Sequence, residues 1–73
     1  MERMKTFIVV IDDFKLAAKD ANFWCLKHFG SPALKYEKVT PKYKWAVHNG
    51  MENTILYEFL YEDDATLFKL SWL

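Results

Sequence analysis

The sequence has few of the residues that crosslink or interrupt a small domain. Its 73 residues include one cysteine, two glycines and two prolines. The single cysteine, Cys25, excludes a disulfide within the chain, and no group of possible ligands has the spacing of a metal site. Because a domain of this size buries little surface, it commonly relies on disulfides, a bound metal or oligomerisation. Oligomerisation is the support that this composition still allows.

Net charge and long apolar runs are scarce as well. Ten basic and ten acidic residues give a formal net charge of zero. This argues against a dedicated nucleic-acid-binding protein, because such proteins are usually strongly basic. The apolar run at 7–11 is too short for a membrane span or for the core of a secretory signal. With one free thiol and no such signal, we expect a cytoplasmic protein that does not enter a membrane.

The charges that are present are divided unevenly along the chain. Residues 1–44 carry nine lysine or arginine residues and five acidic ones. Residues 45–73 carry Lys69 alone against five acidic residues. Opposite charges attract, so we expect the two halves to pair within one fold or across an interface between copies.

Aromatic side chains are abundant. They make up 18% of the chain, as three tryptophans, four tyrosines and six phenylalanines. Aromatic residues dominate the energetics of both cores and interfaces. This is a large number of rings for one small core, so we expect some of them to lie at a surface that a partner covers.

The longest segment with strand character is 54–61, and we expect the rest of the chain to be arranged around it. One face of such a strand carries Ile55, Tyr57, Phe59 and Tyr61. The other face carries Leu56, Glu58 and Leu60. A strand with apolar residues on both faces is usually internal to a sheet. We therefore predict that 54–61 is the central strand.

Two strands and a helix are predicted upstream of it. Residues 6–11 are almost all aromatic or β-branched, which predicts a strand that is buried on both faces. Apolar residues recur at helical spacing over 13–29, which predicts an amphipathic helix that begins near Asp13 and ends at Gly30. Residues 45–48 predict the second of these strands.

The remaining segments are less regular. Asn49 and Gly50 form a signal for a type I′ hairpin turn, although residues 51–53 could instead lengthen the loop. Residues 31–44 permit a short strand but are interrupted by a proline. Residues 62–73 fit either an α-helix or an alternating strand, and the acidic residues at their start favour the helix.

The order of these elements predicts one small α+β domain over residues 1–73. The order β-α-β-β, followed by a helix, is the first part of a ferredoxin-like, split βαβ arrangement. We expect a three-stranded sheet of order 1-3-2 with the helices on one face. Because the chain ends at Leu73, we expect the fourth strand of that fold to be missing and the strand at 6–11 to be an open apolar edge. We expect a homodimer that forms through this edge or through the uncovered aromatic face of the sheet.

Several residues have the chemistry needed for catalysis or metal binding, but each has a simpler structural explanation. Cys25 and His28 lie three residues apart and could, with His48, hold zinc. No further catalytic partner or metal-ligand spacing accompanies them. Asp12 and Asp13 are expected to cap a helix. The same is expected of the acidic residues at the last helix, Glu62, Asp63 and Asp64. We therefore predict no enzymatic activity and no cofactor.

Basic and aromatic residues gather between positions 35 and 45, as they do in surfaces that contact phosphates and stack on bases. The basic residues are Lys35, Lys38, Lys42 and Lys44. The alternative function is therefore a small nucleic-acid-binding regulator. However, the sequence lacks the run of glycine and aromatic residues that an RNA-recognition sheet carries. A solvated loop whose rings pack on the sheet also fits the pattern.

The C-terminal segment resembles the ends of small uncharacterised tailed-phage proteins. It runs Phe-Leu-Tyr-Glu-Asp-Asp-Ala over 59–65 and Phe-Lys-Leu-Ser-Trp over 68–72. In those proteins an aromatic strand and an acidic turn precede the pattern Ala-x-x-Phe-x-Leu-x-Trp. The resemblance implies a small phage accessory protein in the host cytoplasm. Such proteins often bind and block a host factor, including defence machinery.

The leading prediction is a non-enzymatic protein-binding module that is dimeric and could inhibit a host or anti-phage defence protein. Its expected contact residues are exposed aromatics, because aromatic side chains bury a large area at a small entropic cost. They are Tyr36, Tyr43, Trp45, Tyr57, Tyr61 and Trp72.

Overall fold

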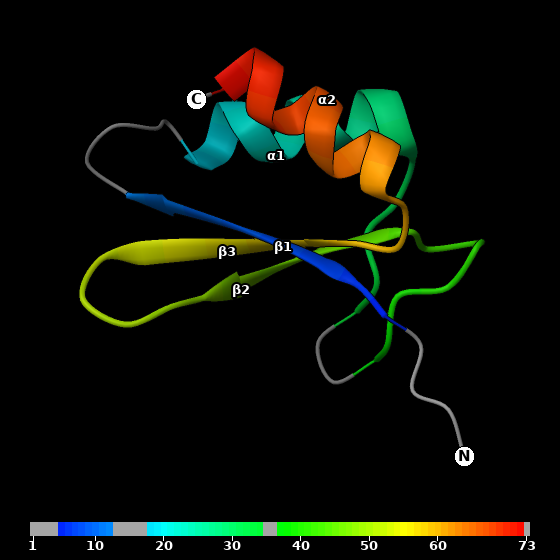
Figure 1. The fold of residues 1–73 in the computed structure, drawn as a ribbon, viewed down its shortest axis with the longest axis horizontal. Coiled ribbons are helices and arrows are strands. Elements are labelled where there is room, and N and C mark those ends of the chain that lie inside the picture. The colour runs from blue at the N-terminus through cyan, green and yellow to red at the C-terminus, as the bar shows by residue number, and fades with distance from the viewer. Residues whose placement is uncertain (1–4, 13–17, 35–36, 73) are drawn as a thin grey trace.

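The chain folds into a three-stranded sheet with two helices on one of its faces (Figure 1). The computed structural model describes residues 5–12, 18–34 and 37–72. The elements follow one another in the order β1 (Phe7–Asp12), α1 (Ala18–Phe29), β2 (Trp45–Asn49), β3 (Thr54–Phe59) and α2 (Glu62–Trp72). The predicted start of the first helix, 13–17, lies outside the described residues, and so do Lys35 and Tyr36.

The sheet has the order β1-β3-β2, so β3 is its central strand as predicted. Both neighbours run antiparallel to β3, with Val9 of β1 and Val47 of β2 directly opposite Tyr57. This is the predicted small α+β arrangement, and its strand order is that of a split βαβ unit. The segment at 62–72 is a helix with three acidic residues in its first turn. Acidic side chains suit that position because the N-terminal end of a helix carries partial positive charge.

The turns on either side of β3 differ from the expectation. β3 ends at Phe59, two residues earlier than predicted, because Leu60 and Tyr61 form the bend into α2. The hairpin before β3 is the longer loop rather than a two-residue turn at Asn49 and Gly50. Its left-handed residues are Glu52 and Asn53, with φ angles of 51° and 67°. The hydroxyl of Thr54 closes this loop by donating to the carbonyl of Met51 at 2.6 Å.

The main core lies between the sheet and the two helices. Tyr57 and Phe59 of β3 point into it and are fully buried, as is Phe68 of α2. The ring centroids of Tyr57 and Phe68 are 4.6 Å apart. The Tyr57 hydroxyl donates a hydrogen bond of 2.6 Å to the side-chain oxygen of Asn22 on α1. This bond gives the buried Tyr57 hydroxyl a partner and links α1 to the central strand.

A smaller cluster lies against the opposite face of the sheet. Figure 1 shows the connector between α1 and β2 descending past the sheet to the side away from the helices. Ala33 and Val39 of this connector are buried there with Ala46 and Leu60, and Tyr43 packs against them. The described connector residues form no strand. The connector therefore covers one part of the second face with loop rather than with regular structure.

The prediction that the first strand is buried on both faces is wrong. Val9 and Ile11 are buried beneath the helices, whereas 49% of Ile8 and 57% of Val10 is exposed. Both helices lie on the other face, and the small cluster covers Ala46 on the far side of the sheet. The outward face of β1 is consequently an apolar surface next to an outer edge.

Candidate functional site

Two of the predicted contact aromatics are part of the core. Trp45 and Tyr57 are 2% and 0% exposed, so the expectation that their rings lie at the surface is wrong. The physical reason is the register, which places both side chains on the helix-covered face together with Phe59. The Trp45 indole N–H also donates a 2.7 Å hydrogen bond to the carbonyl of Gly30, just beyond α1. Both rings are part of the core and stabilise the fold.

The remaining predicted aromatics do not form one surface. Tyr43 is half-buried against the small cluster, and Trp72 is half-buried against the main core. Tyr61 is exposed in the bend between β3 and α2. Tyr36 lies outside the described residues. Because Tyr43 and Trp72 pack against different clusters, the structure does not bring these rings together.

The segment between α1 and β2, which carries the predicted basic residues, is oriented so that the described aromatic rings in and beside it face inward. Lys38 and Lys42 are exposed, and Lys44 is half-buried. The Nζ atom of Lys42 lies 5.5 Å from the centroid of the Tyr43 ring. That ring packs on the small cluster, and the neighbouring Trp45 ring lies in the main core. Bases stack on open aromatic faces, so this arrangement fits a solvated loop better than a stacking platform.

The candidate nucleophile is placed in an unfavourable environment for catalysis. Cys25 is fully buried, and this desolvation raises the pKa of its thiol from 9.0 to about 12. The thiolate is the reactive form, so Cys25 is a poor nucleophile at neutral pH. His28 is exposed and its ring stacks on Trp24, with centroids 4.3 Å apart. Within the described ranges, no group of three or more histidine, cysteine or acidic residues could hold a metal ion.

An apolar groove lies between α1 and β2. Its volume is about 280 Å³, and its lining is almost wholly apolar. Phe23 and Leu26 form its α1 wall and are 66% and 46% exposed. The other lining residues come from α1, the connector and β2, namely Lys19, Asn22, Pro32, Trp45 and Val47. Together with the groove, these two exposed apolar side chains form one contiguous apolar surface, which is the kind of surface that marks a candidate interaction site.

Alternate residues of β2 direct their backbone N–H and C=O groups away from β3, toward the outer edge of the sheet beside this groove. In an antiparallel sheet the N–H and C=O of alternate residues point to opposite sides of the strand. The Leu60 N–H donates to Lys44 and the Gly50 N–H donates to Thr54, so the even-numbered residues of β2 point toward β3. Val47 and Asn49 therefore point outward. The Trp45 carbonyl also points outward, and it accepts the Ala33 N–H at 2.8 Å.

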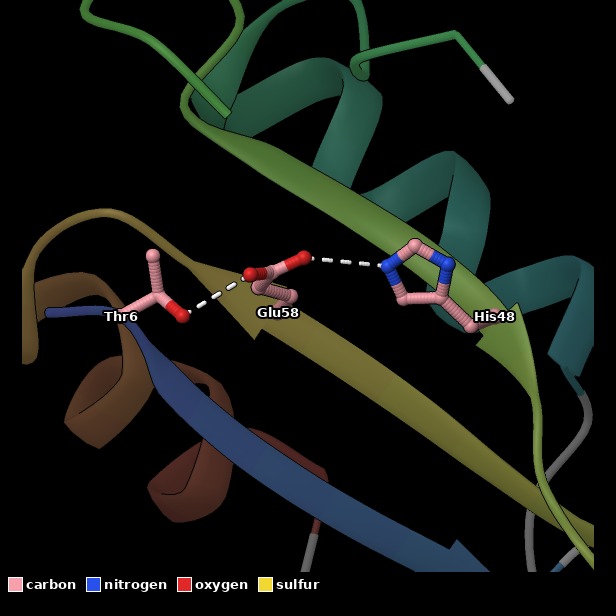
Figure 2. Close-up of polar contacts among 3 residues, drawn as sticks. All are labelled: Thr6, His48 and Glu58. Carbon is pink, nitrogen blue, oxygen red and sulfur yellow. Dashed lines mark hydrogen bonds and ion pairs between the residues drawn. The ribbon is translucent and has the colours of Figure 1, made fainter. Parts of the chain in front are cut away.

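A polar group crosses the face of the sheet that the helices leave uncovered. Figure 2 shows the Glu58 side chain between those of Thr6 and His48. The Thr6 hydroxyl donates to one Glu58 oxygen at 2.8 Å, and the other oxygen lies 3.1 Å from Nε2 of His48. The group links the start of β1 to β2 through the central strand. The glutamate is thereby engaged on both oxygens, which suits a structural tie.

The sequence indicates the groove only in part. Phe23 lies at the margin of the apolar stripe of α1, where it could have widened the buried face. Leu26 falls on roughly the opposite side of the helix from that stripe. Helical spacing places these two residues near one another. The second wall comes from Val47 and Pro32, which are distant in sequence, and no local pattern connects them to α1.

Comparison of the chain with protein-family models, with curated proteins and with solved structures found no match. Among the described residues, no helix is long and apolar enough to cross a membrane.

Proposed function

We propose that the chain is a non-enzymatic protein-binding module whose groove between α1 and β2 receives an extended segment of another protein. The observation that carries this proposal is the exposure of Phe23 and Leu26 over an apolar groove beside the outward-facing backbone of β2. Apolar anchors seated in pockets supply most of the energy of a protein interface. The groove provides such a pocket, and the outward backbone groups of β2 orient the bound segment.

The chemistry of the groove specifies its occupant. Val47 and Asn49 offer outward N–H and C=O groups to which an added strand can hydrogen-bond. The lining is apolar except for Asn22 and Lys19. A segment that pairs with β2 places every second side chain on the helix-covered face. The occupant is thus an extended protein segment with an apolar side chain for the pocket and an acidic side chain near Lys19.

The C-terminal resemblance to small tailed-phage proteins supports a role in the host. We propose that the chain is a phage accessory protein, that it is a homodimer in the host cytoplasm, and that its partner is a host or defence protein. Binding of an extended segment would block that segment from its normal contacts. An inhibitor that acts in this way needs no catalytic group.

Site-specific photocrosslinking in bacterial lysate tests the proposal. A photoreactive phenylalanine at position 23 should crosslink to a discrete protein. The same group at Leu70, which is 80% exposed on α2, should give no such product. Phe23→Asp should abolish capture of that protein, and Leu70→Asp should leave capture intact. A product that forms equally from both positions, or no product from position 23, would contradict the proposal.

A further inference from the structure

The outer edge of β1 is suited to a partner strand. β1 is directly opposite β3 from Phe7 to Asp12, and the alternation established for β2 carries across β3. The odd-numbered residues of β1 therefore direct their N–H and C=O groups toward β3. Ile8 and Val10 direct theirs away from the sheet. Thr6 continues this outward series by one step.

From Phe7 to Ile11 this edge lacks the features that normally prevent strand pairing, and the charged residue of β1, Asp12, lies at its end. Natural edge strands carry charges, proline or bulges that block an added strand. From Phe7 to Ile11 every residue of β1 is aromatic or β-branched, and the pairing with β3 is regular throughout. The exposed side chains of Ile8 and Val10 flank the edge on the uncovered face.

We infer that β1 pairs with β1 of a second copy in an antiparallel register centred on Val9, so that two sheets join into one. The inference rests on the proposed homodimer and names a surface separate from the groove. A two-fold axis at Val9 sets Ile8 opposite Val10 of the second copy. It also sets Thr6 opposite Asp12 of the second copy.

This register matches like side chains better than its neighbours do. Antiparallel partners share a face, so two-fold registers must be centred on a residue and shift in whole-residue steps. Centring on Val10 would set Ile8 against the Asp12 carboxylate. Centring on Ile8 would set Val10 against Thr6. Cross-strand apolar pairs stabilise a sheet, and the Val9-centred register pairs apolar with apolar and polar with polar.

The match between β1 and its own reversed sequence, which pairs Ile8 with Val10 and Thr6 with Asp12, is the reason for choosing a second copy as the occupant. The two-fold axis uses the β1 edge of each copy and therefore closes the assembly, leaving β2 and its groove at the two ends. Val9 and its symmetry mate form a pair without mutual backbone hydrogen bonds, whose Cα atoms lie about 4.5 Å apart. On the uncovered face, Ile8 and Val10 of both copies form one continuous apolar strip.

Light scattering and disulfide trapping test the inference together. The wild-type chain at micromolar concentration should have twice the mass of one chain. Val10→Lys should shift it to the mass of one chain while its circular dichroism is retained. Met51→Lys is the matched control, because Met51 is exposed in the hairpin loop, and it should remain dimeric. A monomeric wild type, or a dimeric Val10→Lys variant, would overturn the inference.

A cysteine scan of β1 then fixes the register. An equimolar mixture of Ile8→Cys and Val10→Cys should form a disulfide-linked dimer under mild oxidation, because these exposed positions lie directly opposite each other in the Val9-centred register. Neither variant alone should crosslink. The wild type is the control for buried Cys25. Crosslinking of either variant alone in place of the mixture would overturn the register. A dimer that crosslinks in none of these samples would overturn the β1 interface. In both cases the groove proposal would still depend on the Phe23 variants.

Discussion

The two outer edges of the sheet differ in what surrounds them. At β2, the Trp45 carbonyl already accepts a hydrogen bond from the Ala33 N–H. Phe23 of α1 lines the groove beside the rest of this edge. At β1, the described structure covers the inner face with helices and leaves Ile8 and Val10 exposed on the other. One edge is short and has a shaped pocket. The other is longer, regular and apolar.

This difference indicates different partners for the two edges. A pocket beside a short edge selects a particular side chain, so it suits recognition of another protein. A regular apolar strand without a pocket has little means of selection other than matching itself. We therefore propose that the β2 edge binds a partner protein and that the β1 edge mediates self-association.

The largest expected effect concerns the support of the β2 edge. Trp45→Ala removes a buried ring and its hydrogen bond to Gly30, so we expect a loss of about 3–5 kcal/mol in the free energy of unfolding. Val10→Ala at the β1 edge should change it by less than about 0.5 kcal/mol. Urea unfolding of dilute samples compares the two. If Trp45→Ala unfolds outright, Trp45→Phe provides the measurable loss. Equal losses at both positions would remove the contrast between the edges.

The next effect concerns the inner stripe of α1, which holds the groove wall in place. Burial raises the pKa of Cys25 from 9.0 to about 12. The folded state therefore keeps the thiol proton at pH values where the unfolded state has lost it. The contribution of this group to the free energy of unfolding is fully present below pH 9. It falls as the pH rises toward 12, by at most about 1.4 kcal/mol per pH unit.

The Cys25→Val variant, which lacks the thiol, is the control for this pH dependence. Urea unfolding between pH 8 and pH 11 should show a shallower alkaline loss for the variant than for the wild type. Alkylation of Cys25 should be slow in the native state and fast in urea. Identical alkaline slopes for both proteins would show that the thiol does not contribute.

A further small effect concerns the polar group that links the two edges. Glu58→Gln removes the charge that contacts His48 and Thr6 across the uncovered face. The side chain of His48 is 45% exposed and that of Glu58 is 24% exposed, so water screens their interaction. We expect a loss below about 1 kcal/mol in urea unfolding. A loss as large as that of Trp45→Ala would mean that the uncovered face contributes as much to stability as the core beneath the helices.

The sequence predicts the framework of the molecule well. Apolar residues on both faces of 54–61 indicate the central strand, and the acidic start of 62–73 favours helix over strand. These are local signals with a direct physical cause. The burial of Tyr57 was also implied locally, since it shares a face with Ile55 and Phe59. An expectation of exposure from aromatic type alone overlooks the face of the strand on which Tyr57 lies.

The site could not be predicted in the same way. The run at 6–11 has the same composition whether it is buried on two faces or exposed on one, because valine and isoleucine fit both environments. The groove forms only when Val47 and Pro32 are brought against Phe23 and Leu26. That juxtaposition depends on the path of the connector, whose sequence carries no regular pattern.

Amide hydrogen exchange, followed residue by residue at several protein concentrations, tests the contrast between the edges most directly. The Val9 and Ile11 amides point toward β3 and should be protected at every concentration. The Ile8 and Val10 amides should exchange rapidly in dilute samples and become protected as the concentration rises. The Val47 and Asn49 amides should remain unprotected throughout. Protection of Ile8 and Val10 that is independent of concentration, or their rapid exchange even in concentrated samples, would contradict the account.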